Sequence, residues 1–261
     1  MKYTHEQLEK HSEILAQKVF LTDRLPHFEL LLSEVKILAE QSETGSTVVS
    51  LERGLLYGGY SLIGPYFHQH NFISVDSSPT SADERGAYNK SKVLDDDFIQ
   101  VPITTRAPIE NTGLDDNIAD LVLVPNLVHH IADQDALFNE MSRITKPNGK
   151  VFVFEPTLRE LHQIPDDYLR YTPYGMYEIM RKVGLEPIDT KLNGGPFSAI
   201  GYCWLQALEY LPEKQRKETE AWFFNEHWPQ LKQWDTQHTQ NLVREHTKFP
   251  VGFSILAEKI K

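Results

Sequence analysis

Short apolar runs alternate with helical patterns along most of this chain. Four runs are rich in β-branched and apolar residues, as buried parallel strands are: 46–51, 71–76, 119–124 and 150–155. A weaker run at 98–103 is a further strand candidate, although Pro102 cannot donate a hydrogen bond to a sheet. Because strands alternate with helical segments, the pattern predicts an α/β fold with a doubly wound sheet.

Helix-capping signals support this alternation. Thr4 and Gln7 form a capping box at the start of the first predicted helix. Asp133 is placed to cap the helix that follows the strand at 119–124. Thr172 is placed to cap a later helix, which Gly184 would close.

The remaining segments divide the chain into a helical start, a sheet domain and an insert. Residues 1–45 predict an N-terminal helical preface, and residues 46–261 predict one α/β domain. Two closing strands are predicted at 186–192 and 251–259. The stretch 195–250 between them holds all four tryptophans, and we interpret it as a helical cap insert packed on the sheet domain.

Composition excludes several classes of function. Lys and Arg total 26 against 37 Asp and Glu, and this net charge of −11 argues against nucleic-acid and anionic-membrane partners. Cys203 is the only cysteine, so an intramolecular disulfide and a cysteine-based metal site are excluded. The polar N-terminus and the lack of a long apolar run predict a cytoplasmic protein that neither carries a secretory signal nor spans a membrane.

Acidic and glycine residues follow the first two predicted strands, where a parallel sheet binds its ligands. Glu52 follows the first strand and precedes Gly54 and Gly58, and Asp76 ends the second strand. A carboxylate can accept two hydroxyl hydrogen bonds, as a ribose diol requires, and glycines let the backbone approach a ligand closely. These residues indicate a cofactor that contains a nucleoside. The alternative is a structural turn beside an ordinary strand-end acid.

The segment 114–156 carries a more specific pattern. It reads LDDNIADLVLVPNLVHHIADQDALFNEMSRITKPNGKVFVFEP, with Asp120, Asn126, His130 and the turn 146–149 at characteristic positions. The segment resembles the core of class I S-adenosylmethionine-dependent methyltransferases. Nicotinamide-dependent Rossmann enzymes lack a turn like the one at 146–149, so a nicotinamide-dependent oxidoreductase is a weaker alternative.

The resemblance extends over about residues 46–192 and returns at 251–259. It implies a Rossmann-like seven-stranded sheet whose last strand is antiparallel, with N-terminal helices and a helical insert before that last strand. It also implies S-adenosyl-L-methionine as the cofactor. The implied cofactor-binding residues are Glu52, Gly54, Gly58, Asp76, Ser77 and Asn126.

Two departures from the family pattern keep an alternative open. Leu56 stands where the middle glycine of the family's loop belongs, and the segment 104–107 lacks the acidic residue expected after the third strand. The alternative is therefore a catalytically inactive, methyltransferase-like ligand-binding or partner subunit. Asn126 is equally interpretable as a turn residue that binds local backbone.

The segment that follows the fifth strand supplies candidates for catalysis. Residues 162–175 are similar to the H-x-x-P-x-D-x-x-R-Y-T-x-x-G segment of many bacterial methyltransferases. We predict His162 and Glu155 as catalytic residues, because an imidazole suits removal of a proton from a hydroxyl group. Arg170 and Tyr171 are candidates for binding an anionic or sugar-like substrate.

A structural interpretation of the same residues remains open. Asp166 or Asp167 can form an ion pair with Arg170, and His162 can be an ordinary loop histidine. His129 is a further candidate for substrate binding, although adjacent histidines are expected not to face one pocket together. The spacing of His129 and His130 is also poor for metal ligands, so no metal is predicted.

Together these features predict a methyltransferase that acts on a small molecule. The predicted acceptor is a hydroxyl oxygen on a sugar-like or natural-product-like compound. Methyl transfer asks for little chemistry from the protein beyond positioning, because the sulfonium of the cofactor is already activated. A homodimer is compatible with the sequence.

Overall fold

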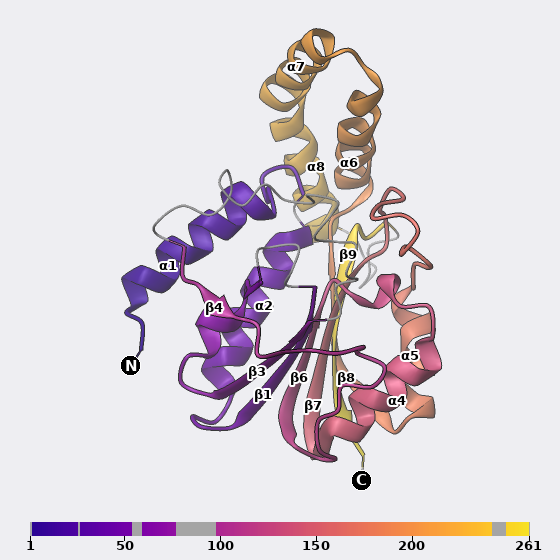
Figure 1. The fold of residues 1–261 in the computed structure, drawn as a ribbon. Helices are drawn as coiled ribbons and strands as arrows, with labels where there is room; N and C mark the ends of the chain where they lie inside the picture. Colours follow the sequence, from indigo (N-terminus) through magenta and orange to yellow (C-terminus); the bar gives the residue numbers. More distant parts are fainter. Residues whose placement is uncertain (1, 26, 54–58, 77–97, 242–248, 261) are drawn as a thin grey trace.

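A seven-stranded sheet forms the centre of the computed structural model (Figure 1). The structure describes residues 2–25, 27–53, 59–76, 98–241 and 249–260. The strand order is β5-β3-β1-β6-β7-β9-β8. The strands are β1 (Thr47–Glu52), β3 (Asn71–Asp76), β5 (Thr105–Arg106), β6 (Ala119–Pro125), β7 (Thr145–Pro156), β8 (Leu185–Asn193) and β9 (Gly252–Lys259).

The direction of the strands confirms the predicted fold class. Neighbours from β5 to β7 run parallel, whereas β9 lies antiparallel between β7 and β8. The parallel strands therefore end at one edge of the sheet, where ligand sites form in such folds. Among the described residues, no helix combines the length and the apolar character needed to cross a bilayer.

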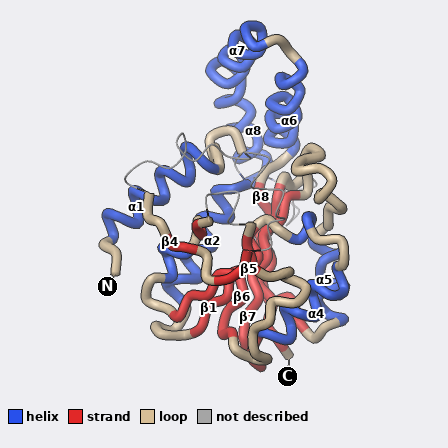
Figure 2. The backbone as a smooth tube through the Cα atoms, viewed as in Figure 1, coloured by secondary structure: helices blue, strands red, loops and turns tan. Residues whose placement is uncertain are grey.

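Helices cover both faces of the sheet (Figures 1 and 2). One face carries α1 (His5–Ile14) and α2 (His27–Gln41), which share a buried apolar cluster with Phe154 of β7. The other face carries α4 (Gln134–Ile144) and α5 (Pro173–Lys182) over a second cluster. Short helical turns are η1 (Leu15–Val19), η3 (Gly64–Phe67), η5 (Val128–His130), η6 (Leu208–Tyr210) and η7 (Phe223–His227).

The predicted helix caps are confirmed. The Thr4 hydroxyl and the Gln7 side chain form the reciprocal capping box of α1. The Asp133 side chain accepts a hydrogen bond from the backbone of Ala136 at 3.0 Å at the start of α4. Thr172 caps α5 in the same way, and the helix ends just before Gly184, whose φ is 79°.

Two strand predictions differ from the structure. The segment 98–103 is not a strand of the main sheet: β4 (Val101–Pro102) pairs instead with β2 (Tyr60–Ser61) in a separate two-stranded ribbon. The edge strand of the main sheet beside β3 is β5. It follows Pro102 in the chain and contains no proline, so both of its residues keep a backbone N–H donor. The turn predicted at 146–149 lies within the irregular first part of β7, where Asn148 has a φ of 61°.

The insert is helical, as predicted, and stands above the end of the sheet in Figure 1. It contains α6 (Pro196–Ala207), α7 (Glu213–Trp222) and α8 (Trp228–Asn241). Asp235 of α8 accepts hydrogen bonds from the backbone of Phe197 and Ser198 at the start of α6, at 3.0 and 2.5 Å. The indole of Trp228 donates to the carbonyl of Asp23 at 2.6 Å, which ties the insert to the N-terminal helices.

Candidate active site

Two acidic residues lie side by side at the carboxyl edge of the sheet. Glu52 and Asp76 are the last residues of β1 and β3 and are partners in the strand register. Both are buried, with exposed fractions of 6% and 2%. Burial raises the pKa of Glu52 to about 7, although the Ser61 hydroxyl, which donates to Glu52 Oε1 at 2.6 Å, acts to lower it.

Asn126 completes this edge at the end of β6. Its φ is 61°, and its backbone N–H donates to the carbonyl of Phe154 at 2.8 Å. Its buried Oδ1 has no hydrogen-bond partner among the residues that the structure describes. Gln163, on the loop after β7, has the same features: a φ of 52° and a buried Oε1 that no described group satisfies.

A cavity of about 60 Å³ joins these groups. Its lining residues are Phe20, Leu31, Glu52, Arg53, Leu62, Ile63, Pro125, Asn126, His130 and Gln163. Glu52 and Asn126 border it from the sheet, and His130 and Gln163 border it from the segments that follow β6 and β7. Unsatisfied amide oxygens beside a carboxylate suit a ligand that is cationic and carries hydrogen-bond donors.

Arg53 is a site residue that the sequence pattern did not single out. Its side chain is 8% exposed, and Nη2 lies 3.7 Å from Asp166 Oδ2. The ion pair joins the loop after β1 to the loop after β7 across the cavity. Arg53 lies between Glu52 and Gly54, at a position where the family's glycine loop accepts any residue, so the sequence pattern does not identify it.

Several predicted cofactor contacts fall on parts of the chain that the structure does not describe. Gly54, Leu56, Gly58 and Ser77 lie outside the described residues. Near the adenine end of the predicted site, Arg106 is the register partner of Asp76 at the end of β5. A cation therefore stands at this edge beside Asp76, in the segment where the family pattern has an acid.

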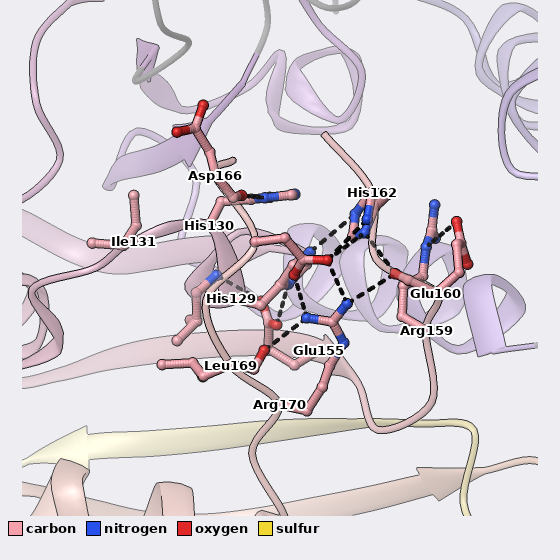
Figure 3. Close-up of polar contacts among 12 residues, drawn as sticks. His129, His130, Ile131, Glu155, Arg159, Glu160, His162, Asp166, Leu169 and Arg170 are labelled. Carbon is pink, nitrogen blue, oxygen red and sulfur yellow. Dashed lines mark hydrogen bonds and ion pairs between the residues drawn. The ribbon is translucent and has the colours of Figure 1, made fainter. Parts of the chain in front are cut away.

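Glu155 orients a histidine at the end of β7 (Figure 3). Its Oε1 accepts the backbone N–H groups of Leu127 and Val128, both at 2.7 Å. Its Oε2 accepts the Nδ1 hydrogen of His129 at 2.6 Å. Glu155 is 2% exposed, and these three hydrogen bonds place it to orient His129.

His162 meets this pair from the loop after β7. Its Nε2 lies 3.3 Å from His129 Nε2, and its Nδ1 lies 3.2 Å from both the carbonyl of Glu160 and Asp167 Oδ2. Burial, and then the nearby positive charge of Arg159, lower the pKa of His162 to about 4. The imidazole is therefore neutral at pH 7.

His129 and His130 both lie against His162, although only His130 lines the cavity. The η5 turn brings both rings against His162, with centroid separations of 5.2 Å for His129 and 4.9 Å for His130. Nδ1 of His130 donates to the carbonyl of Asp166, and burial lowers the pKa of His130. One ring nitrogen of each of the three histidines lies within 4.8 Å of the others.

Arg170 and Tyr171 do not line this cavity, and neither do His129 and His162. Arg170 donates to both carboxylate oxygens of Asp167, at 2.5 and 2.9 Å, and also to the carbonyls of Leu169 and Glu160. Tyr171 packs its ring edge-on against Phe138 beside the core. Arg170 therefore takes part in the ion pair that was the alternative interpretation, and it shapes the loop that carries His162.

Comparisons with known proteins agree with this geometry. Residues 53–153 match the family model described as Methyltransferase domain, Methyltransf_11. No curated protein sequence matches the chain.

Solved structures share the fold at low sequence identity. A chain from the complex between the Haloferax volcanii Trm112 methyltransferase activator and a proposed methyltransferase is 14% identical with a TM-score of 0.51, and the match covers 97% of this chain and 95% of that one. The cyclase SpnF is 14% identical with a TM-score of 0.50, over 87% and 80% of the two chains. Phosphoethanolamine N-methyltransferase 2 of Haemonchus contortus, in complex with S-adenosyl-L-methionine, is 18% identical with a TM-score of 0.48, over 88% of this chain and 53% of that one.

The sheet order with its antiparallel β9, the paired strand-end acids and the family match all agree. Residues 53–153 therefore match a methyltransferase domain, within a sheet of the Rossmann-like methyltransferase type, and S-adenosyl-L-methionine is the cofactor that this match implies.

Proposed function

We propose that this methyltransferase transfers a methyl group to a hydroxyl oxygen of a small molecule, of a sugar-like or natural-product-like kind. The observation that carries the proposal is the cavity that joins Glu52 and Asn126 to His130 and Gln163, beside the histidine that Glu155 orients. Transfer to a hydroxyl group needs a group that removes its proton during attack, whereas a neutral amine or a thiolate already has a free lone pair. A cluster of histidines next to the cofactor end of the sheet supports such an acceptor.

The strand-end residues suit the cofactor. S-adenosyl-L-methionine supplies an activated methyl group, so the protein has to bind and orient rather than activate it. In this proposal Asp76 accepts the ribose hydroxyls and Glu52 faces the methionine ammonium group, and their neighbouring positions at the strand ends support these roles. The unsatisfied Oδ1 of Asn126 offers one more acceptor.

His162 and His129 form the proposed proton acceptor. A proton taken by His162 Nε2 can be shared with His129 Nε2, 3.3 Å away. The carboxylate of Glu155 then stabilises the positive charge through His129 Nδ1. In this scheme His162 contacts the substrate, and Glu155 and His129 act through it.

The proposal places the enzyme in the cytoplasm, with a small molecule as its substrate and no nucleic-acid partner. The net charge of −11 and the presence of only one cysteine support that view. A homodimer stays compatible with it.

Cofactor binding is tested by calorimetry with S-adenosylhomocysteine. We expect the wild-type protein to bind it, and we expect Asp76→Asn to weaken binding by about 100-fold, because a carboxylate that accepts two hydroxyl hydrogen bonds is lost. Asp189→Asn is the matched control, since this aspartate is exposed on β8, far along the sheet order from β3. Absence of binding by the wild type at millimolar ligand would refute the proposal.

The acceptor atom is tested by mass spectrometry of products from a panel of hydroxylated compounds. We expect methyl ethers, and we expect Glu155→Gln to lower kcat by about 100-fold or more, because an amide at this position forces His129 into the wrong tautomer. The same variant should still bind S-adenosylhomocysteine. Methylation at nitrogen or carbon by the wild type would contradict the hydroxyl acceptor.

A further inference from the structure

Three imidazole rings from two separate chain segments share one small volume beside the cavity (Figure 3). His129 and His130 come from the η5 turn after β6, and His162 comes from the loop after β7. Their rings are buried or half-buried, and one nitrogen from each lies within 4.8 Å of the other two. From this geometry we propose that His129, His130 and His162 form a binding site for one Zn²⁺ ion or a similar divalent transition-metal ion.

The separation of the ring nitrogens fits a shared metal ion. Two histidine nitrogens bound to one zinc ion at about 2.0–2.1 Å lie about 3.3–3.4 Å apart in a tetrahedral site. The Nε2 atoms of His129 and His162 are 3.3 Å apart. The third nitrogen, from His130, lies within 4.8 Å of the other two.

Each ring is held through its other nitrogen, as metal-binding histidines usually are. Nδ1 of His129 donates to the Glu155 carboxylate, and Nδ1 of His130 donates to the carbonyl of Asp166. Nδ1 of His162 faces the carbonyl of Glu160. These acceptors fix the tautomer of each ring and leave the Nε2 lone pairs available as ligands.

The same hydrogen bonds leave two nitrogen lone pairs facing each other, and a cation between them would remove the repulsion. Because oxygen acceptors face Nδ1 of both His129 and His162, both protons lie on Nδ1. The two Nε2 lone pairs then point at each other across 3.3 Å. A metal ion between them turns this repulsion into coordination, and the alternative is a single proton shared by the two rings.

The charges around the cluster nearly balance, with one carboxylate in excess of the arginines. Three arginine side chains are each paired with a carboxylate near the cluster: Arg53 with Asp166, Arg159 with Glu160 and Arg170 with Asp167. Glu155 is a fourth carboxylate, and its partners are His129 and two backbone N–H groups. The shell around the three histidines therefore has a formal charge of about −1, which a bound divalent ion would overcompensate by only one unit.

Three neutral histidines without a thiolate suit zinc, cobalt or nickel rather than calcium or magnesium. A three-histidine set leaves a fourth position for water or substrate, and His130 borders the cavity. With the ion bound, Nε2 of His129 and of His162 are ligands and no longer accept a proton, so the fourth position would lower the pKa of the acceptor hydroxyl instead. That role rests on the proposed function, whereas the metal site itself does not.

The test is metal titration of protein that has been treated with a chelator and dialysed. We expect calorimetry to show one Zn²⁺ bound per chain with micromolar or tighter affinity, and we expect Co²⁺ to give the visible absorption of a tetrahedral site. His162→Ala should weaken binding by at least 100-fold, and Glu155→Gln by about 10- to 100-fold, because the orientation of His129 is lost. His5→Gln is the control for binding by exposed histidines and should leave the titration unchanged.

A second variant shows whether any loss of binding in His162→Ala reflects the missing ligand or a misfolded protein. His162→Cys should retain Zn²⁺ and add a sulfur-to-cobalt charge-transfer band in the near ultraviolet, which a merely structural histidine would not produce. The proposal is overturned if the wild type binds neither ion, as a shared proton would require, or if His162→Ala binds as tightly as the wild type. Binding of S-adenosylhomocysteine by the wild type, measured separately, reports on the proposed function alone.

Discussion

Because Glu52 is buried at the carboxyl edge of the sheet, its ionisation makes the stability of the fold depend on pH. Burial raises its pKa to about 7 from an ordinary value of 4.5. Between these two values the folded state holds a proton that the unfolded state has lost. The stability gained from Glu52 is therefore full below pH 4.5 and is lost as the pH rises through 7.

We accordingly expect Glu52→Gln to stabilise the protein at alkaline pH. Glutamine keeps an oxygen for the Ser61 hydroxyl but removes the ionisation. At pH 8 the variant should exceed the wild type in the free energy of unfolding by about 1–3 kcal/mol, and at pH 5 the two should be nearly equal. Urea unfolding at both pH values measures this, with Glu178→Gln on the exposed surface as the control. An equal difference at both pH values would contradict the assignment.

Single residues were predictable from the sequence where strand ends fix their place. Glu52, Asp76 and Asn126 follow strands, and parallel strands bring their ends together, so their convergence could be expected. The approach of His162 to His129 could not, because it depends on the path of a loop that no spacing rule describes. The ion pair of Arg53 with Asp166 joins two such loops and was missed for the same reason.

At the scale of elements, the pairing of α6 with α8 depends on one glycine. A Cβ added at Gly201 of α6 would overlap the ring of Trp228 in α8, and that ring is itself held by its hydrogen bond to Asp23. We expect Gly201→Ala to destabilise the protein by about 1–3 kcal/mol, because the rigid indole cannot step aside.

The measurement is thermal unfolding followed by tryptophan fluorescence, since all four tryptophans lie in the insert. Gly175→Ala is the matched control, because its added Cβ would lie at an ordinary 3.4 Å from its neighbours and alanine favours the helix. That control should be neutral or slightly stabilising. An unchanged melting temperature for Gly201→Ala would mean that α6 and α8 are not packed as described.

Elements with strong periodicity or clear caps were predicted well, and short edge pieces were not. The strand at 71–76 and the capped starts of α4 and α5 coincide with their predictions, because burial on both faces and side-chain caps leave direct signals. The two-residue strands β4 and β5 have no such signal. Their position depends on which strand offers free backbone groups for pairing. Here β4, which contains Pro102, pairs with β2, and β5 pairs with β3.

On the scale of the whole molecule, the N-terminal helices pack on the sheet through a shared buried cluster. Phe28 of α2 is 5% exposed and lies with its ring centroid 5.8 Å from that of Phe154 on β7 and 4.8 Å from that of Phe20. Residues 1–45 were predicted as a preface. The buried cluster that they share with β7 leads us to expect that they do not unfold separately.

We therefore expect Phe28→Ala to lower the stability of the entire chain by about 3–5 kcal/mol, as removal of a buried aromatic ring does. Circular dichroism reports helices throughout the molecule, whereas tryptophan fluorescence reports the insert, which Trp228 ties to the N-terminal helices. In urea, both midpoints should coincide in the wild type and should fall together in the variant. Tyr210→Ala, which removes a ring that is 92% exposed, should shift neither. Separate midpoints, or a loss confined to one probe, would show that the helices, sheet and insert do not share one cooperative transition.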